Sequence, residues 1–510
     1  MKKIAILLGL LILHMIASGQ PVKKVSDELV LVTMKKASAY MANEVSCHGG
    51  YLWYYKEDLS EVFGEVPARK SQIWVQGTGT PAMGHIFLDM YEATGDEEYL
   101  GYAKKAASAL IFGQHPMGGW HYFIDFDKKG LEGWYRDTAS QFIIGWEEYR
   151  YYYGNCTYDD NVTQGATKFL ISLYKATLEP VYLAPLLKAL NFILISQYPN
   201  GGWPQRYPLR YDFAHDGLPD YTSYYTLNDG AMNNTIDVLL EAYELLGDER
   251  YLMAAKRGAD FFMLVQGPEG QAGWTDQFDM DLQPTAARTH EPASFQVRYT
   301  LSTIHQLEKM FLYTGDRRYL RPIPMALDWI ESSVLKIDDR GRPEFAKWYE
   351  PVSNYPITMD YLNEFTAEGY MRYKYTVDSS VNFVKLPGKS SYREQYELIR
   401  DVEPGKEREM YENLNQRSRR NSTVDEQKIT DLINSVNENG IWIESFTVHD
   451  ISRTMVPNYK SVVKNGSYLY AVKELEGIST QTYMRNMLLL MDFLNRSNEY
   501  KSEFKEMNDE

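Results

Sequence analysis

The sequence predicts an all-α protein, an α/α toroid (partial barrel) of helical hairpins with long loops on one face. A turn motif close to Thr-Gly-Asp-x-x-Tyr-Leu recurs between apolar residues at three- and four-residue steps, which is the pattern of paired amphipathic helices. A Gly-Trp loop follows most copies, so we expect equivalent loops to gather at one end of the molecule. The length of these loops favours a closed ring with a cleft over an open α-solenoid.

The repeats give the hairpins in order. Each unit is a helix, a short turn and a second helix that runs into a glycine-aromatic loop. The turn motif occupies residues 94–100, 177–183, 246–252 and 314–320; the loops contain residues 118–120, 201–203 and 272–274, with further copies at 49–51 and 439–442.

The N-terminus has the pattern of an export signal. Lys2 and Lys3 precede an apolar run at 4–16 and the small residues 17–19. We predict a signal peptide at 1–19, because the run is too short for a comfortable membrane-spanning helix. The mature protein is expected to be secreted or periplasmic, monomeric and without a membrane anchor.

Charge and composition restrict the partners. The net charge of −16 becomes −18 once the two leader lysines are removed, which argues against nucleic acid. An acidic polysaccharide is also repelled unless local arginines or a bound cation reverse the field. The 41 tyrosines suit either sugar-lining grooves or an ordinary aromatic core. Cys47 and Cys156 form a disulfide only if the geometry permits it.

The last third of the chain is less regular. We expect the toroid at 20–345 and a C-terminal extension at 346–510. Short strands are expected at 345–395, and a solvated, charged helical insertion at 396–437. An amphipathic helix capped by Ser479 or Thr480 is expected to close the toroid against the first helix.

One loop differs from its siblings in carrying polar groups. Asn-Gly-Gly-Trp-Pro-Gln-Arg-Tyr-Pro at 200–208 is followed by Asn-Asp-Gly-Ala-Met at 228–232. These segments predict the rim of a site for an acidic sugar, with stacking on aromatic rings and polar contacts to the ligand. The candidate substrate-binding residues are Trp203, Gln205, Arg206, Asn228 and Trp274.

At these segments the chain resembles the pectic acid lyases of polysaccharide lyase family 10. Residues 160–163 (Asp-Asn-Val-Thr) and 287–294 (Ala-Arg-Thr-His-Glu-Pro-Ala-Ser) are similar to two further motifs of that family. The resemblance covers about residues 155–335, and its most specific part is Asn-Gly-Gly-Trp-Pro-Gln. It implies β-elimination of de-esterified polygalacturonate, dependence on Ca²⁺ and an arginine as the base.

The chemistry of elimination agrees with these residue types. The C5 proton of a 4-linked uronan is weakly acidic, and a cation shared by protein and substrate carboxylates stabilises the enolate. Ca²⁺ prefers several oxygen ligands. Asp160 and Asp229 are the candidate calcium ligands, each beside an asparagine at the start of a helix. The alternative for each aspartate is a helix N-cap.

The candidate base is Arg298, with Arg288 as the second choice and Arg206 as a clamp for the substrate carboxylate. The segment between 294 and 298 is shorter than the insert that carries the arginine in familiar family members. Without an arginine base, the protein could be a divergent lyase in which Tyr299 or His290 replaces it. It could also be an inactive relative that binds uronan.

Two other functions remain open. A glycoside hydrolase on the same toroid needs two carboxylic acids facing across the cleft, and Asp276 and Asp279, with Asp229, could supply them. A carbohydrate-binding protein needs only the rings of Trp120, Trp203 and Trp274. The lyase is favoured because its motifs occur in family order.

Overall fold

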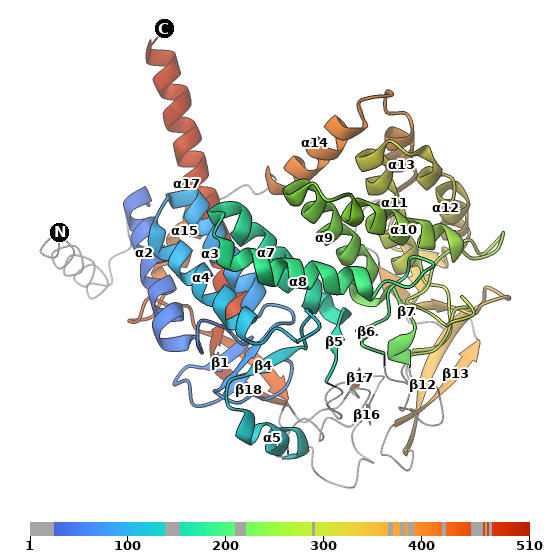
Figure 1. Cartoon of the computed structure of the whole chain (residues 1–510), viewed down its shortest axis with the longest axis horizontal. Helices are drawn as coiled ribbons and strands as arrows, with labels where there is room; N and C mark the ends of the chain where they lie inside the picture. Colours follow the sequence, from blue (N-terminus) through green and yellow to red (C-terminus); the bar gives the residue numbers. More distant parts are fainter. Residues whose placement is uncertain are drawn as a thin grey trace, which may run out of the picture.

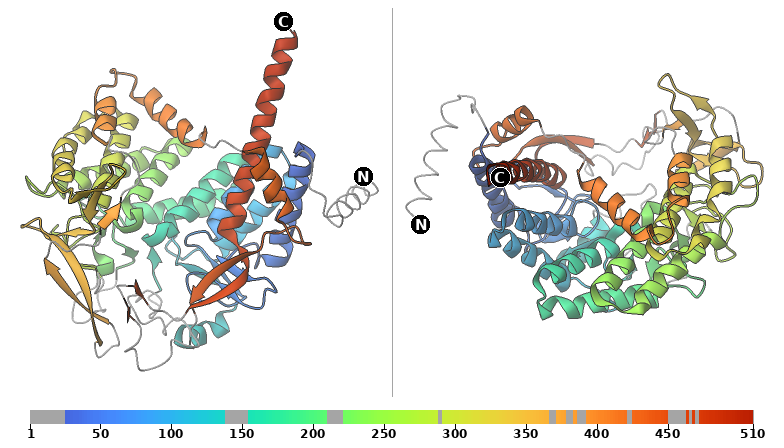
Figure 2. Two further views of the ribbon diagram at one scale, coloured as in Figure 1. Left: turned by 180° about the vertical axis from the view of Figure 1, so that it is seen from behind. Right: turned by 90° about the horizontal axis from the view of Figure 1, so that it is seen from above.

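The computed structural model of this chain describes residues 25–137, 154–209, 221–287, 291–365, 371–377, 383–385, 392–420, 425–449, 463–464, 467–468 and 472–509. The predicted signal peptide at 1–19, Arg288 and His290 lie outside these residues. The described helices follow one another in an arc from the N-terminal part to the fourth hairpin (Figure 1; Figure 2, right).

Helical hairpins form the body of the molecule and coincide with the predicted repeats. Their first helices pack against one another in sequence, α3 on α7, α7 on α9 and α9 on α11, which confirms the α/α toroid. The hairpins are α3 (Thr80–Thr94) with α4 (Glu97–Phe112), α7 (Val162–Thr177) with α8 (Pro180–Ile195), α9 (Ala231–Leu246) with α10 (Glu249–Leu264), and α11 (Val297–Thr314) with η7 (Arg317–Leu320) and α12 (Ile323–Ser332).

The Gly-Asp turn ends one helix and starts the next. Gly95 has a φ of 68°, in the left-handed region that a glycine adopts without strain. The carboxylate of Asp96 then accepts the backbone N–H of Glu98 and caps the second helix. Asp248 and Asp316 cap the equivalent helices in the same way. The second copy replaces the glycine with Leu178, whose φ is 54°.

The tryptophan of each loop returns beneath its own hairpin. The indole N–H of Trp120, Trp203 and Trp274 donates to a carbonyl oxygen of the preceding helix segment, with partners Leu110 at 2.8 Å, Ile193 at 2.9 Å and Phe262 at 2.8 Å. Trp442, in the weaker copy of the loop at 439–442, likewise donates to the carbonyl of Leu432 at 2.9 Å. All four rings are buried, so the loops share one anchor.

A glutamine joins each loop to the next hairpin. The side-chain amide of Gln197 donates to the carbonyl oxygens of Gly201 in its own loop and Ala254 on α10, both at 2.9 Å. Gln114 and Gln266 make the equivalent pairs of bonds. At Gly201, where φ is 100°, a Cβ would lie 2.0 Å from the carbonyl oxygen of Arg257. The close approach of loop and helix therefore requires a glycine.

Short strands close each repeat at the loop end. The strand before a hairpin pairs with the strand after it: β3 (Gln72–Trp74) with β4 (Phe123–Asp125), β5 (Cys156–Thr157) with β6 (Arg206–Tyr207), and β7 (Tyr225–Thr226) with β8 (Gln277–Phe278). In the fourth repeat Phe295 and Tyr349 exchange backbone hydrogen bonds at 2.9 and 3.0 Å. Short helices lie beside these strands: η2 (Lys128–Gly130), α5 (Leu131–Asp137), η4 (Asp159–Asn161), η5 (Tyr221–Ser223) and η6 (Asn228–Gly230).

The two ends of the described chain meet. An antiparallel sheet of order β15-β18-β1-β2 joins β1 (Tyr54–Lys56) and β2 (Val62–Phe63) to β15 (Glu444–His449) and β18 (Val472–Ser479). Helix α17 (Thr480–Asp509) packs on α2 (Asp27–Tyr40), which continues into the π-helical η1 (Met41–Val45). The hydroxyls of Ser38 and Tyr483 are 2.7 Å apart, and Ser479 Oγ accepts the N–H of Thr482. The expected closing helix is confirmed.

Small sheets and charged helices follow the fourth hairpin, and the first strands begin before the predicted boundary at residue 346. Apart from β15 and β18, the strands after α12 are β9 (Lys336–Ile337), β10 (Pro343–Ala346), β11 (Trp348–Tyr349), β12 (Pro356–Phe365), β13 (Met371–Val377), β14 (Phe383–Lys385), β16 (Val463–Lys464) and β17 (Ser467–Tyr468). The charged helices are α13 (Tyr392–Arg400), α14 (Glu407–Arg420) and α15 (Glu426–Asn434); α14 packs on α11 and α15 on α17. Cys47 and Cys156 are free thiols, so the disulfide that the sequence left open is not formed.

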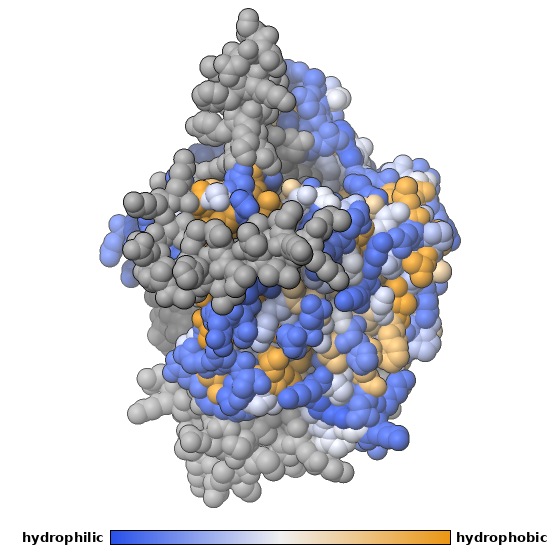
Figure 3. All heavy atoms as spheres, turned by 90° about the vertical axis from the view of Figure 1, so that its left-hand side faces the viewer, coloured by the Kyte–Doolittle hydropathy of each residue, from blue (hydrophilic) through white to orange (hydrophobic). Residues whose placement is uncertain are grey.

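Figure 3 shows the face that lies at the left of Figure 1, where hydrophilic residues alternate with small apolar areas. Among the helices that the structure describes, none is both long enough and apolar enough to cross a bilayer.

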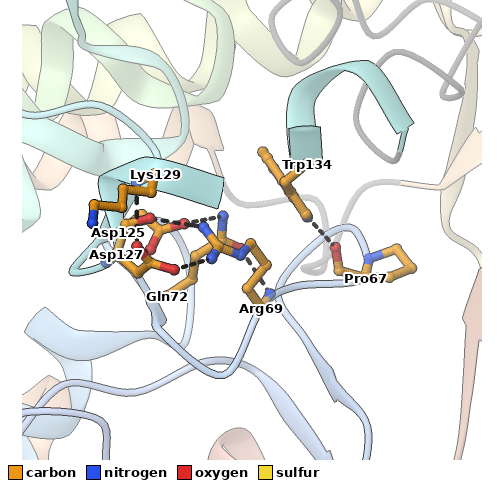
Figure 4. Close-up of polar contacts among 7 residues, drawn as sticks. All are labelled: Pro67, Arg69, Gln72, Asp125, Asp127, Lys129 and Trp134. Carbon is orange, nitrogen blue, oxygen red and sulfur yellow. Dashed lines mark hydrogen bonds and ion pairs between the residues drawn. The ribbon is translucent and has the colours of Figure 1, made fainter. Parts of the chain in front are cut away.

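A buried ion pair fastens the loop before β3 to β4 (Figure 4). The guanidinium of Arg69 donates to the carboxylate of Asp125 at 2.8 Å and to that of Asp127 at 2.6 Å. Gln72 donates to the same Asp125 oxygen at 3.1 Å, and the side chain of Asp125 is fully buried. The indole of Trp134, on α5, donates to the carbonyl of Pro67 at 3.0 Å. These contacts hold residues 65–76, called the N-terminal wall below, against β4 and α5.

Replacing Arg69 with methionine removes the cation from a buried carboxylate. We expect a loss of about 3 kcal/mol in the free energy of unfolding, measured by urea denaturation followed by circular dichroism. Arg250→Met is the control, since its pair with Asp248 is exposed and should contribute nothing measurable. Equal midpoints for the two variants would contradict the prediction.

Candidate functional site

Asp160 and Asp229 occupy equivalent positions in two neighbouring repeats. Each lies in a single 3-10 turn immediately before the first helix of its hairpin, Asp160 in η4 before α7 and Asp229 in η6 before α9. Both backbones are left-handed, with φ values of 49° and 48°. The helix N-caps are Asn161 and Gly230, and neither makes a side-chain cap bond. The alternative role as N-caps is therefore wrong for both aspartates.

The packing of α7 on α9 brings the two turns together. Carboxylate oxygens of Asp159, Asp160 and Asp229 lie within 4.8 Å of one another, an arrangement suited to a metal ion. Asp159 was not among the residues predicted from the sequence. Its signal was present as the first residue of the Asp-Asp-Asn run, but adjacent residues do not reveal which side chains converge.

Neutral donors hold the cluster. Tyr122 OH donates to Asp159 Oδ2 at 2.6 Å, and Gln76 Nε2 donates to Asp160 Oδ2 at 2.5 Å. Asn228 Nδ2 donates to Asp229 Oδ2 at 2.7 Å. The hydroxyl of Tyr299 in turn donates to Asn228 Oδ1 at 2.5 Å, so Asn228 links Tyr299 to the cluster.

The electrostatics of the cluster favour a cation. Burial raises the pKa of Asp160 to about 9, and the nearby carboxylates of Asp159, Asp229 and Glu65 add to the shift. Converging carboxylates supply the hard oxygen donors that Ca²⁺ prefers. The donor set at this position therefore fits a calcium ion.

A pocket of about 270 Å³ opens beside the cluster, and Asp229 and Asn228 lie on its wall. Arg298 lies on the same wall, exposed, with its guanidinium 5.8 Å from the centre of the Tyr299 ring. Arg298, the first choice for the base, and Asp229, a predicted calcium ligand, therefore line the same pocket. The other lining residues are Asp276, Glu291, Gln296, Val297, Phe345, Ala346, Lys347 and Trp348.

Asp276 is an acid of this pocket whose pKa is raised. Burial raises its pKa to about 6, and the charge of Glu291 acts in the same direction. Asp279, its companion in the hydrolase alternative, accepts the backbone N–H groups of Asp281 and Gln283, both at 2.9 Å. Asp279 therefore shapes the turn after β8, and only Asp276 faces the pocket.

Trp203 and Trp274 are not available to a sugar. Their exposed fractions are 1% and 0%, because each ring packs beneath its own hairpin. The predicted stacking role is corrected for both, and Trp120 is equally buried. A Gly-Gly-Trp motif looks the same whether the ring faces the solvent or the core, so the sequence pattern could not separate the two roles.

Arg206 and Gln205 also lie in the interior, with exposed fractions of 1% and 4%. The guanidinium of Arg206 is 5.3 Å from the centre of the Tyr122 ring and donates to its hydroxyl at 3.4 Å. Tyr122 in turn donates to Asp159, so a chain of two hydrogen bonds connects Arg206 to the acidic cluster. Direct clamping of a substrate carboxylate by Arg206 or contact of the Gln205 side chain with substrate does not agree with this burial.

Comparison with known proteins finds a family whose match includes the loops described above. Residues 144–338 match the model of the pectic acid lyase family. Over this region the chain is similar to that family. The match includes all the motifs that carried the resemblance, at 160–163, 200–208, 228–232 and 287–294, and marks the region as that of a polysaccharide lyase.

Solved structures with a similar course of the chain include a family 10 polysaccharide lyase from Cellvibrio cellulosa, at 21% identity and a TM-score of 0.36 over 51% of this chain and 83% of that one. A mutant of that lyase was solved in complex with trigalacturonic acid. An α-1,6-mannanase of Salegentibacter sp. aligns over 91% of this chain and 98% of its own at 13% identity, with a TM-score of 0.38. No curated protein matches the chain.

Substituting Trp203 with phenylalanine tests its assignment to the core of the pectic acid lyase region. Loss of the indole N–H should lower the free energy of unfolding by about 1–2 kcal/mol and leave the affinity for an acidic oligosaccharide within a factor of two. Thermal unfolding and titration calorimetry measure the two effects. Weakened binding at unchanged stability would show that the Trp203 ring contacts the sugar and would contradict its assignment to the core.

Proposed function

We propose that this protein is an exported pectate lyase-like enzyme that cleaves de-esterified polygalacturonate by calcium-assisted β-elimination. The observation that carries the proposal is the convergence of three aspartates beside a pocket lined by Arg298, within a region that matches the pectic acid lyase family. Export rests on the leader-like residues 1–19. The complex of a similar lyase with trigalacturonic acid supports an acidic polysaccharide as substrate.

Asp159, Asp160 and Asp229 would hold the calcium ion. When bound, Ca²⁺ supplies positive charge to the substrate carboxylate, which makes the C5 proton more acidic and stabilises the enolate. Asn228 orients Asp229, and Tyr299 fixes the amide of Asn228 by donating to its oxygen. Tyr122 and Gln76 orient the other two carboxylates.

Arg298 is the proposed base. Its exposed side chain can reach a sugar ring in the pocket beside Asp229. A guanidine nitrogen takes the C5 proton, the electrons of the C–H bond form the C4–C5 double bond, and the bond from C4 to the glycosidic oxygen breaks. The leaving oxygen takes a proton from water. Because free arginine holds its proton strongly, the base needs the neighbouring cation and close contact with the substrate. Arg288 is the second choice.

A glycoside hydrolase is the second candidate. Asp276, with a pKa raised to about 6, shares the pocket with Asp229 and has the environment of a general acid. A hydrolase would release reducing ends without an unsaturated product. The product therefore separates the two activities.

Polygalacturonate incubated with the protein and Ca²⁺ should give the ultraviolet absorbance of an unsaturated uronide, and a chelator should abolish it. Asp229→Asn is expected to lower the rate more than about 100-fold, because it removes a charged ligand beside the reacting sugar. Asp279→Asn is the control and should stay within a factor of two. Reducing ends without absorbance would identify a hydrolase, and binding without either product would leave a uronan-binding protein.

Arg298→Lys and Arg288→Lys, assayed side by side, test the base. We expect the Arg298 variant to lose about 10²–10⁴-fold in kcat with a small change in KM, since the role concerns proton transfer. The Arg288 variant should keep a kcat close to that of the parent. A large loss confined to Arg288→Lys would reverse the assignment, and small equal losses would exclude both residues.

A further inference from the structure

The cluster of three aspartates has a fourth acidic neighbour that comes from outside the family match. Glu65 lies in the loop after β2, and Gln76 lies between β3 and α3, whereas the match begins at residue 144. The side-chain nitrogen of Gln76 donates both to Asp160 Oδ2 at 2.5 Å and to Glu65 Oε2 at 2.6 Å. One nitrogen therefore holds the two carboxylates next to each other.

The spacing of these oxygens agrees with a shared cation. Because both contact the same nitrogen, their separation cannot exceed the two hydrogen-bond lengths taken together. Two oxygens bound to one Ca²⁺ at 2.3–2.6 Å are at most about 5 Å apart, which is the same limit. Glu65 thus lies within reach of an ion held by Asp160.

The amide of Gln76 is oriented by the protein. Its oxygen accepts the indole N–H of Trp74 at 2.8 Å, so its nitrogen points toward the two carboxylates. The loop of Glu65 lies directly on the same indole, because a Cβ added to Gly64 would be 2.2 Å from Cδ2 of Trp74. Trp74 and Gln76 therefore fix Glu65 relative to Asp160, and the Arg69 ion pair holds the same wall.

We propose that Glu65 is a fourth carboxylate ligand of the calcium site, with Gln76 as the positioning residue that places it beside Asp160. The inference rests on the proposed function, since it concerns the same ion. It assigns part of the site to the N-terminal wall at 65–76, so the matched region by itself holds an incomplete set of ligands.

Ion binding without substrate tests this assignment. Titration calorimetry with Ca²⁺ gives the affinity, and Tb³⁺ luminescence sensitised by nearby aromatic rings, of which Trp74 is one, reports a bound ion. Glu65→Gln should weaken Ca²⁺ binding about 10-fold or more and lower the Tb³⁺ signal. Glu57→Gln is the matched control, because it removes the same charge from an exposed residue of the same part of the chain, and its affinity should stay within a factor of two.

Glu65→Asp, which keeps the charge, should bind Ca²⁺ more tightly than Glu65→Gln, and thermal unfolding in chelator should be the same for both. Parental affinity in Glu65→Gln would overturn the role of Glu65 while leaving the three-aspartate site in place. A parent protein that binds neither ion would overturn the calcium site as a whole. Chelator-resistant elimination by that protein would overturn the calcium requirement and leave the lyase activity standing.

Discussion

The arrangement of the molecule depends on how each loop is fastened to its helices. A buried tryptophan donates to the helix before it, and a glutamine bonds both its own loop and the next hairpin. The repetition of these contacts orients successive hairpins alike and collects their loops at one end. Because α7 and α9 then lie side by side, the turns that precede them meet, and their aspartates converge.

Convergence of like charges is costly, and the structure shows how it is accommodated. The pKa of Asp160 rises to about 9 because burial and neighbouring carboxylates disfavour its charge. Neutral donors, the phenol of Tyr122 and the amides of Gln76 and Asn228, contact the cluster. An acidic protein can attract an acidic polymer at such a point if a bound cation or local arginines reverse the field, which links the net charge of −16 to the proposed calcium site.

Much of the fold could be predicted because its determinants are local. A left-handed glycine followed by a capping aspartate specifies a turn between helices, and apolar spacing specifies their buried faces. The same reasoning found the strands of the extension, its charged helices and the closing helix after Ser479. The site was predictable only in part, through motifs that placed Asp160, Asn228 and Asp229 at the ends of loops.

By itself, the sequence determined the repeats, the helices and the loops that carry polar residues, because these follow from periodicity and turn chemistry over a few residues. Only the tertiary structure decided which side chains face the cleft. It buried Trp203 and Arg206, added Asp159, and brought Glu65 and Gln76 to Asp160 from a distant segment. The reason is that exposure and contact depend on packing between repeats, which a local motif does not specify.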